Sequence, residues 1–279
     1  IVPNDYYLLY LNHMKFKESN SSSQIGVEIT DVDISKPLSK DELNAIYDLW
    51  VRNAVAIFPN QKLSHTEYND FAMQFGSFGD EPFLTPMKSQ VHIVELRRKA
   101  TEEAMHFGGS WHSDWSFQPS PPAATMLHSK IIPPFGGDTL FSNSALAYDE
   151  MSSEMKDKIQ NLKGIHSAKL PYADNGFYAL ENKKRTMKIK SSKSANKQHL
   201  HPIVREHLDT KRKSLFINPV YTIGIEGMDD MEAFEFLSEL FEHMTQDKYI
   251  YRHKWKEDML IMWDNRSVMH MAEGGYDGY

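Results

Sequence analysis

Two histidines and one aspartate have the residue types and the spacing of a metal site. His112 and Asp114 are separated by one residue. In a β-strand, residues i and i+2 point to the same face, so the imidazole and the carboxylate would converge on one point. His270 lies far downstream and would add a second imidazole from another strand. Two nitrogens and one oxygen on one face of a metal leave open coordination positions, an arrangement that suits non-heme Fe(II).

The residues around these candidates favour a functional site. His112 lies in the segment 108–117, where two glycines permit close backbone approach and the flanking Trp and Phe rings would exclude water. His270 follows a tight turn predicted at Asp264-Asn265, after an apolar strand. Two simpler interpretations stay open. His112 and Asp114 would only pair with each other in a half-buried strand, and His270 would be a core histidine bonded to a backbone carbonyl.

Most of the 13 histidines need no special role. Six of them lie in polar or helical segments, where we expect surface positions. These six are His13, His65, His166, His199, His207 and His243.

The composition excludes several classes of protein. The 279 residues are 41% hydrophobic and 25% charged, as in a soluble globular protein with a substantial core. A net charge of −7 argues against nucleic acid or an anionic membrane as the main partner. Without cysteine, a metal site must use His, Asp and Glu. No apolar run of membrane-spanning length and no signal peptide are found, so we expect a cytoplasmic location, with Met14 as the candidate native start.

The elements that must position the candidate ligands begin with strands and helices in the first 76 residues. Residues 1–24 are expected to be an extension or loop, and residues 25–29 and 54–58 to be strands. Ser39 with Glu42, and Ser64 with Glu67, have capping-box spacing and predict two helices, the second ending near Gly76.

From residue 91 onward the pattern changes to short strands separated by Gly and Pro turns, which predicts a sandwich or barrel. Strands are expected at 91–96, 123–129, 138–142, 215–220, 249–255 and 259–263. Helices are expected near 144–160 and 229–246. Since no repeat or linker is found, residues 25–279 are interpreted as one domain.

Residues 181–199 are rich in Lys, Arg and Ser. The favoured interpretation is a solvated, mobile surface loop. The alternative is a basic lid over an anionic substrate.

Four motifs together resemble the taurine dioxygenase/TfdA family of Fe(II)- and 2-oxoglutarate-dependent dioxygenases. The motifs occur in the family's order and spacing, and the resemblance extends from about residue 25, beginning with Gly26–Asp33, to the end of the chain. They are Trp111-His-Ser-Asp114, Pro121-Pro-Ala-Ala124, Gly136-Gly-Asp-Thr-Leu140, and Trp263-Asp-Asn-Arg266 followed by His270.

The resemblance implies a mainly β fold with flanking helices, built on a double-stranded β-helix, or jelly-roll, core. It implies His112, Asp114 and His270 as iron ligands and Thr139 as a contact of the distal carboxylate of 2-oxoglutarate. The family's arginine for that carboxylate is expected beyond Tyr279. The implied reaction uses O2, releases succinate and CO2, and hydroxylates a C–H bond. A homodimer or homotetramer is also implied.

The implied substrate is a small organic anion, such as a taurine-like sulfonate, a sulfate ester or an aryloxyalkanoate. Taurine itself is disfavoured at two positions. Glu81 stands where taurine-specific relatives place a histidine for the sulfonate, and Gly108 where they place an asparagine. Trp115 and Tyr221 are further candidate pocket residues. Glu81 indicates either a cationic group on the substrate or a surface salt bridge.

Two other functions use the same three residues. One is a Zn-dependent hydrolase with a metal-bound water as nucleophile, although no extra Glu or His general base is evident near the motif. The other is a non-catalytic jelly-roll protein that binds a small molecule. Anaerobic addition of Fe(II) and 2-oxoglutarate distinguishes the three.

Overall fold

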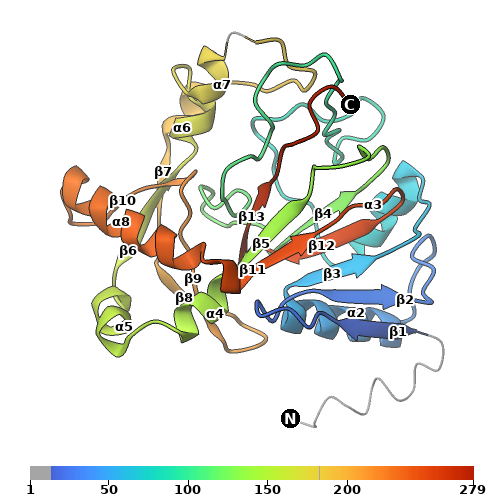
Figure 1. Ribbon diagram of the computed structural model, residues 1–279, viewed down its shortest axis with the longest axis horizontal. Helices are drawn as coiled ribbons and strands as arrows, with labels where there is room; N and C mark the ends of the chain where they lie inside the picture. Colours follow the sequence, from blue (N-terminus) through green and yellow to red (C-terminus); the bar gives the residue numbers. More distant parts are fainter. Residues whose placement is uncertain (1–13, 182) are drawn as a thin grey trace.

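Two β-sheets that face each other form the centre of the computed structural model, which describes residues 14–181 and 183–279 (Figure 1). The larger sheet has the order β1 (Lys15–Glu18), β2 (Val27–Thr30), β3 (Val55–Phe58), β12 (Leu260–Asp264) and β4 (Ala124–His128). The smaller sheet has the order β11 (Ile250–His253), β5 (Thr139–Asn143) and β13 (Val268–Ala272). Only β2 and β3 pair in parallel among these neighbours of the described chain.

Alternating side chains divide the larger sheet into two apolar faces. Val55 and Ile57 of β3, with Ile261 and Trp263 of β12, point into the layer between the two sheets, where Phe141 and Val268 of the smaller sheet meet them. The residues between them in sequence point the other way, into a second apolar cluster. Strands that are buried on both faces read as continuous apolar runs, which is why Ala54–Phe58 shows no polar alternation.

Two helices cover the outer face of the larger sheet. They are α2 (Lys40–Asn53) and α3 (His65–Met73), and Leu49 and Phe71 are among the residues that they bury there. Both predicted capping boxes are formed, with the Ser39 and Ser64 side chains accepting from the backbone amides of Glu42 and Glu67. Such a cap contributes about 1 kcal/mol and fixes where each helix begins.

A second group of elements lies on the left in Figure 1. It contains a three-stranded sheet, β10 (Thr222–Ile225), β6 (Lys163–Ser167) and β7 (Gln198–Pro202), and the hairpin β8 (Val204–Glu206) and β9 (Lys213–Leu215). Its helices are α4 (Ser144–Asp149), α5 (Ser153–Ile159), α6 (Lys169–Tyr172), α7 (Phe177–Leu180) and α8 (Asp230–Met244), and the 3-10 turns are η1 (Lys193–Asn196) and η2 (Asp247–Tyr249). The apolar face of α8 packs on Leu146, Ile217 and Met269.

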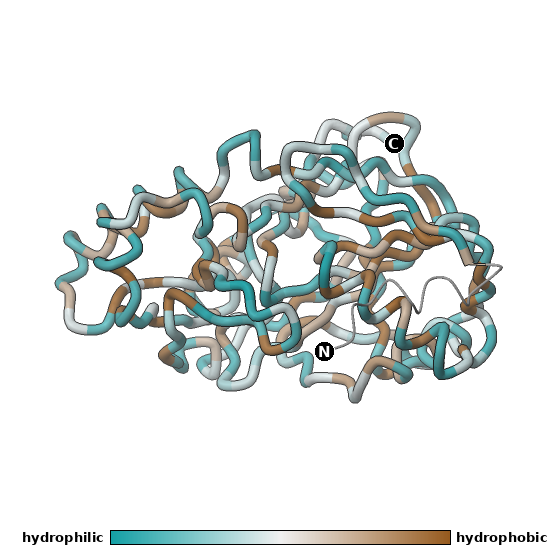
Figure 2. The backbone as a smooth tube through the Cα atoms, turned by 90° about the horizontal axis from the view of Figure 1, so that it is seen from below, coloured by the Kyte–Doolittle hydropathy of each residue, from teal (hydrophilic) through white to brown (hydrophobic). Residues whose placement is uncertain are grey.

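The tube in Figure 2 shows hydrophobic stretches gathered along neighbouring strands and hydrophilic stretches along the peripheral turns. No helix among the described residues is long and apolar enough to cross a bilayer.

Several predicted elements are wrong or incomplete. Residues 91–96 form no strand, because this stretch belongs to a long irregular excursion. The helix expected at 144–160 is split, since Ser152 caps a new helix, and the strand expected at 215–220 ends at Leu215. Residues 15–18 of the predicted N-terminal extension pair with β2 at the sheet edge, whereas residues 1–13 lie outside the described chain. With five helices in addition to α2 and α3, the fold is mixed α/β rather than mainly β.

Candidate metal centre

A backbone bridge brings the two candidate histidines together. His112 donates its amide to the His270 carbonyl over 3.0 Å, and His270 donates to the His112 carbonyl over 2.7 Å, as in one rung of an antiparallel ladder. Directly paired residues in such a ladder project to the same side. The two imidazole rings therefore lie side by side, with centroids 4.2 Å apart and their planes tilted by 43°.

Asp114 completes the group. Its Oδ1 lies 3.6 Å from His112 Nε2 and 3.8 Å from His270 Nε2. One ligand atom from each residue lies within 4.8 Å of the others, and all three residues are buried. The group lies beside the apolar layer between the sheets, because the His270 ring is 4.7 Å from the Trp263 ring and 6.0 Å from the Phe141 ring.

The local backbone differs from the strand that the sequence predicts. His112 forms a single bridge, and Asp114 already lies in a turn that continues through Trp115. Trp115 has a φ of 48°, a left-handed conformation that bulky residues rarely adopt and that persists only where the surroundings hold it. The convergence of His112 and Asp114 thus comes from a turn after the bridge, not from strand alternation.

Asn265 holds this turn in place. Its Oδ1 accepts from the Asp114 amide over 3.3 Å and from Trp263 Nε1 over 3.1 Å. Its Nδ2 donates to Thr125 Oγ1 over 2.9 Å. Ser113 adds a bond from its hydroxyl to the Val268 carbonyl over 2.9 Å. The turn after β12 therefore positions a ligand that lies about 150 residues earlier in the chain.

Asp264, the neighbour of Asn265, has a structural role. It is buried and accepts from His207 Nε2 over 2.9 Å and from Arg266. Burial would raise its pKa, but the hydrogen bonds from His207 and Arg266 outweigh burial and lower it. This ion cluster fixes the turn that carries Asn265.

The electrostatics of the three residues fit a bound cation. Burial raises the pKa of Asp114, and its Oδ2 has no hydrogen-bond partner within the described chain. Burial, together with the neighbouring His112, lowers the pKa of His270 well below its usual value. His112 Nδ1 lies 2.7 Å from the Ser110 carbonyl, which makes Nδ1 the donor and leaves Nε2 free to bind a metal. A divalent cation would supply the positive partner that the buried Asp114 carboxylate lacks.

Thr139 lies on the same sheet face as His270. In the β5–β13 register it pairs with Ala272, two residues beyond His270, so all three side chains share one face. Thr139 Oγ1 accepts from Trp255 Nε1 over 3.0 Å. A hydroxyl has one hydrogen to donate, and this arrangement leaves it available to another acceptor.

The four candidate substrate residues lie around the triad. The Tyr221 ring is buried and 6.2 Å from the His112 ring. A Cβ at Gly108 would lie 3.6 Å from His112 Cε1, an ordinary van der Waals contact, so this position borders the ligand directly. Trp115 packs against the cluster that contains Tyr221. Glu81 and Asp114 interact electrostatically, each negative charge raising the energy of the other.

Of the aromatic residues next to the triad, the sequence indicated Trp115, Phe117 and Tyr221 but missed the others. Phe83, Phe117 and Tyr172 form one buried cluster with Tyr221, and Phe107 and Tyr178 pack against it. These rings come from irregular segments and two four-residue helices, where no periodicity exists to predict a shared surface.

Residues 181–199 cover this cluster instead of standing free in solvent. Met187 and Ile189 pack on it, and Ile189 bridges to Leu84. The neighbouring Arg185 forms a buried ion pair with Glu181. The lysines of the segment that lie at 183, 184, 188 and 190 are exposed, as expected for a surface segment.

Two of the six histidines expected at the surface are buried. His207 bonds to Asp264, and His166 Nδ1 lies 3.1 Å from Ser116 Oγ with its ring stacked on Phe216. Residues distant in sequence provide the hydrogen-bond partners of both rings. The polar residues next to them in sequence therefore did not indicate that they are buried. His13 lies outside the described residues.

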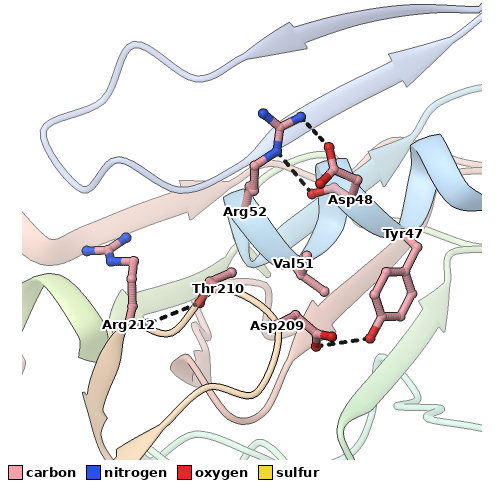
Figure 3. Close-up of a pocket in the computed structure, with 7 residues that line it drawn as sticks. All are labelled: Tyr47, Asp48, Val51, Arg52, Asp209, Thr210 and Arg212. Atoms are coloured by element: carbon pink, nitrogen blue, oxygen red, sulfur yellow. Dashed lines mark hydrogen bonds and ion pairs between the residues drawn. The ribbon is translucent and has the colours of Figure 1, made fainter. Parts of the chain in front are cut away.

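A groove of about 560 Å³ lies between α2 and the β8–β9 turn (Figure 3). Its charged and phenolic side chains are engaged with each other or with neighbours: Asp48 with Arg52, Tyr47 with Asp209, and Arg212 with Asp149. None of the three candidate ligands lines it, so its size alone does not indicate a second reaction centre.

Comparison with known proteins gives a consistent result. The family model described as taurine catabolism dioxygenase TauD, TfdA family, matches residues 17–279. The α-ketoglutarate-dependent 2,4-dichlorophenoxyacetate dioxygenase of Cupriavidus pinatubonensis strain JMP 134 is 32% identical over 260 residues, covering 88% of this chain and 87% of that protein. The alkylsulfatase of Acinetobacter baylyi is 29% identical, covering 91% and 79%.

A solved structure shows the same architecture. The taurine dioxygenase from Burkholderia xenovorans has a TM-score of 0.76 and 27% identity to this chain, and the match covers 94% of this chain and 83% of that one.

Proposed function

Because the chain belongs to the TauD/TfdA family and is an α-ketoglutarate-dependent dioxygenase, we propose that Fe(II) is its metal, held by His112, Asp114 and His270. The observation that carries this assignment is the buried group of two imidazole nitrogens and one carboxylate with an unpartnered oxygen. This donor set leaves open positions on one side of the ion. When bound, Fe(II) and 2-oxoglutarate supply the oxidation of a C–H bond by O2, with release of succinate and CO2.

The protein contributes position and exclusion of water. The Ser110 carbonyl fixes the tautomer of His112, and Asn265 fixes the turn that carries Asp114. Thr139 is proposed to donate its free hydroxyl hydrogen to the distal carboxylate of 2-oxoglutarate, since Trp255 occupies its oxygen as an acceptor. The aromatic cluster around Tyr221 keeps bulk water from the substrate.

The two facing sheets are proposed to form the double-stranded β-helix core of this family, because the His112–His270 bridge lies at their margin and the apolar layer fills the space between them. The substrate is proposed to be a small organic molecule with an anionic group. The support is the range of relatives, whose names cover an aryloxyacetate, alkyl sulfates and taurine.

The test is anaerobic titration of the purified protein with Fe(II) and 2-oxoglutarate. We expect a visible metal-to-ligand charge-transfer band, and 2-oxoglutarate-dependent succinate release once O2 is admitted. His112→Ala should abolish the band, whereas His65→Ala, which changes an exposed histidine on α3, should leave it intact. A wild-type protein that binds both components without the band, or a His112→Ala variant that retains it, would contradict the assignment.

A further inference from the structure

Glu81 presents a buried carboxylate oxygen with no partner. Its Oε1 accepts from the backbone amides of Phe83 and Leu84 over 2.8 and 2.7 Å, which fixes the orientation of the group. Its Oε2 is buried and has no hydrogen-bond partner among residues 14–181 and 183–279. The surface salt bridge that the sequence left open as an explanation is therefore absent from the described chain.

Aromatic rings connect this carboxylate to the metal centre. The Phe83 ring stacks on the Tyr172 ring at 4.6 Å and lies 5.7 Å from the Phe117 ring. Phe117 is 4.9 Å from Tyr221, whose ring meets the His112 ring in a T-shaped contact with centroids 6.2 Å apart. Besides burial, the negative charges of Glu81 and Asp114 both raise the pKa of Tyr172, so this phenol lies within electrostatic range of both carboxylates.

Tyr178 and Phe107 extend the same set of rings. Tyr172 and Tyr178 have centroids 5.5 Å apart, and Tyr178 and Phe107 have centroids 5.9 Å apart. Glu81, which accepts from the Phe83 amide, therefore lies at one end of a buried series of aromatic rings.

Cations in the neighbourhood do not neutralise Glu81. Burial and the negative Asp114 raise the pKa of Glu81, while the two backbone amides and Lys190 lower it. Lys190 is exposed to solvent, and its charge is screened accordingly. Arg185 lies 5.1 Å above the Tyr178 ring, but Glu181 pairs with it. No cation of the described chain is thus in contact with the buried Glu81 Oε2, which is available to a positively charged ligand.

We propose that Glu81 and the rings of Phe83, Tyr172 and Tyr221 bind a cationic nitrogen of the substrate. An ammonium group is attracted both by a carboxylate and by the faces of aromatic rings, and such a site is stronger when it is desolvated. An anionic group at the same place would meet the charges of Glu81 and Asp114. This inference rests on the proposed function, since it concerns the same substrate site. It narrows the substrates to zwitterions, whose ammonium group binds here and whose anionic group lies elsewhere.

Binding of two probes of the same shape tests the proposal: choline and its uncharged isostere 3,3-dimethylbutan-1-ol. Ethanolamine serves as a smaller cation. Each is titrated by calorimetry into the anaerobic protein loaded with Fe(II) and 2-oxoglutarate. We expect one of the two cations to bind at least about tenfold more tightly than the uncharged isostere.

Glu81→Gln keeps an oxygen for the two backbone amides and removes the charge. This variant should lower the affinity for the cation by at least about tenfold and change the affinity for the uncharged isostere by less than about twofold. The matched control is Glu103→Gln, which removes an equal charge from an exposed ion pair with Lys183 and should leave all affinities unchanged. Tyr172→Phe should retain most of the cation affinity, because the ring face remains.

The proposal is overturned if neither cation binds more tightly than the uncharged isostere, if neither cation shows saturable binding, or if Glu103→Gln lowers the cation affinity as much as Glu81→Gln does. The charge-transfer band of the same samples reports on the proposed function independently. A sample with the band and without cation binding refutes only the substrate inference, whereas a sample without the band refutes the metal assignment.

Discussion

Removal of the Asp114 charge should have opposite effects on stability in the absence and in the presence of metal. The Asp114 side chain is only 12% exposed, and its Oδ2 lacks a hydrogen-bond partner in the described chain. Without a cation, an unpaired buried charge costs several kcal/mol. A buried amide left without one partner costs about 1–3 kcal/mol. The metal-free Asp114→Asn variant should therefore be more stable than the wild type by about 2 kcal/mol.

For a chain of this size, about 2 kcal/mol corresponds to a rise in Tm of about 3–4 °C. Bound metal should reverse this difference in stability between the variant and the wild type. A divalent ion at 100 times its Kd stabilises the wild type by about 2.7 kcal/mol. The variant lacks the one anionic ligand and should gain less than about 1 kcal/mol at the same concentration.

Thermal unfolding at pH 8 checks both halves of this prediction, first in EDTA and then with Mn(II) as a redox-stable substitute. Asp70→Asn is the matched control, since it removes an exposed aspartate on α3 and should shift neither Tm. The reasoning is refuted if Asp114→Asn in EDTA unfolds at or below the Tm of the wild type. Burial of the metal-free carboxylate would then not destabilise the folded protein.

Three further predictions concern the surroundings of the triad. Thr139→Val should raise the Kd of 2-oxoglutarate about tenfold through loss of a hydrogen bond to a charged group, while Thr139→Ser should retain affinity; titration of the charge-transfer band measures both, and equal values for the two variants would exclude the proposed contact. Asp264→Ala should lower the free energy of unfolding by about 3–5 kcal/mol, because it leaves His207 and Arg266 without their buried partner; urea denaturation measures this, and a loss below about 1 kcal/mol would contradict it. Burial lowers the pKa of His253 from its usual value to about 4, so the neutral ring contributes stability that is present above about pH 6.5 and lost as the pH falls toward 4. His253→Phe should flatten that loss by about 3 kcal/mol in denaturation curves recorded from pH 7 to 4, and an unchanged slope would show that the ring is not buried in its neutral form.

The sequence by itself determined the features that depend on near neighbours. Both capping boxes are formed, because a serine and a glutamate three residues apart satisfy each other within one turn. β12 and β13 follow from an apolar run, a tight turn and a second apolar run, and His270 lies on β13 as predicted. The identity of the three residues in the triad was also available, since the spacing of four motifs indicated a family.

Tertiary structure decided how these residues meet. His112 and Asp114 converge through a turn and an unusual backbone conformation at Trp115, which Asn265 holds from a position about 150 residues later in the chain. His166 and His207 are buried because distant partners satisfy them, although their neighbours in sequence are polar.

The proposed cation site depends even more on tertiary structure. Phe83, Tyr172 and Tyr221 come from three segments without periodicity, and Glu81 becomes an unpartnered buried carboxylate only when those segments close around it. Periodicity and capping report short-range order, whereas the charge and shape of a binding site arise from contacts between segments that no local pattern links. The sequence therefore determined which three residues form the candidate metal site, and packing decided which side chains surround it.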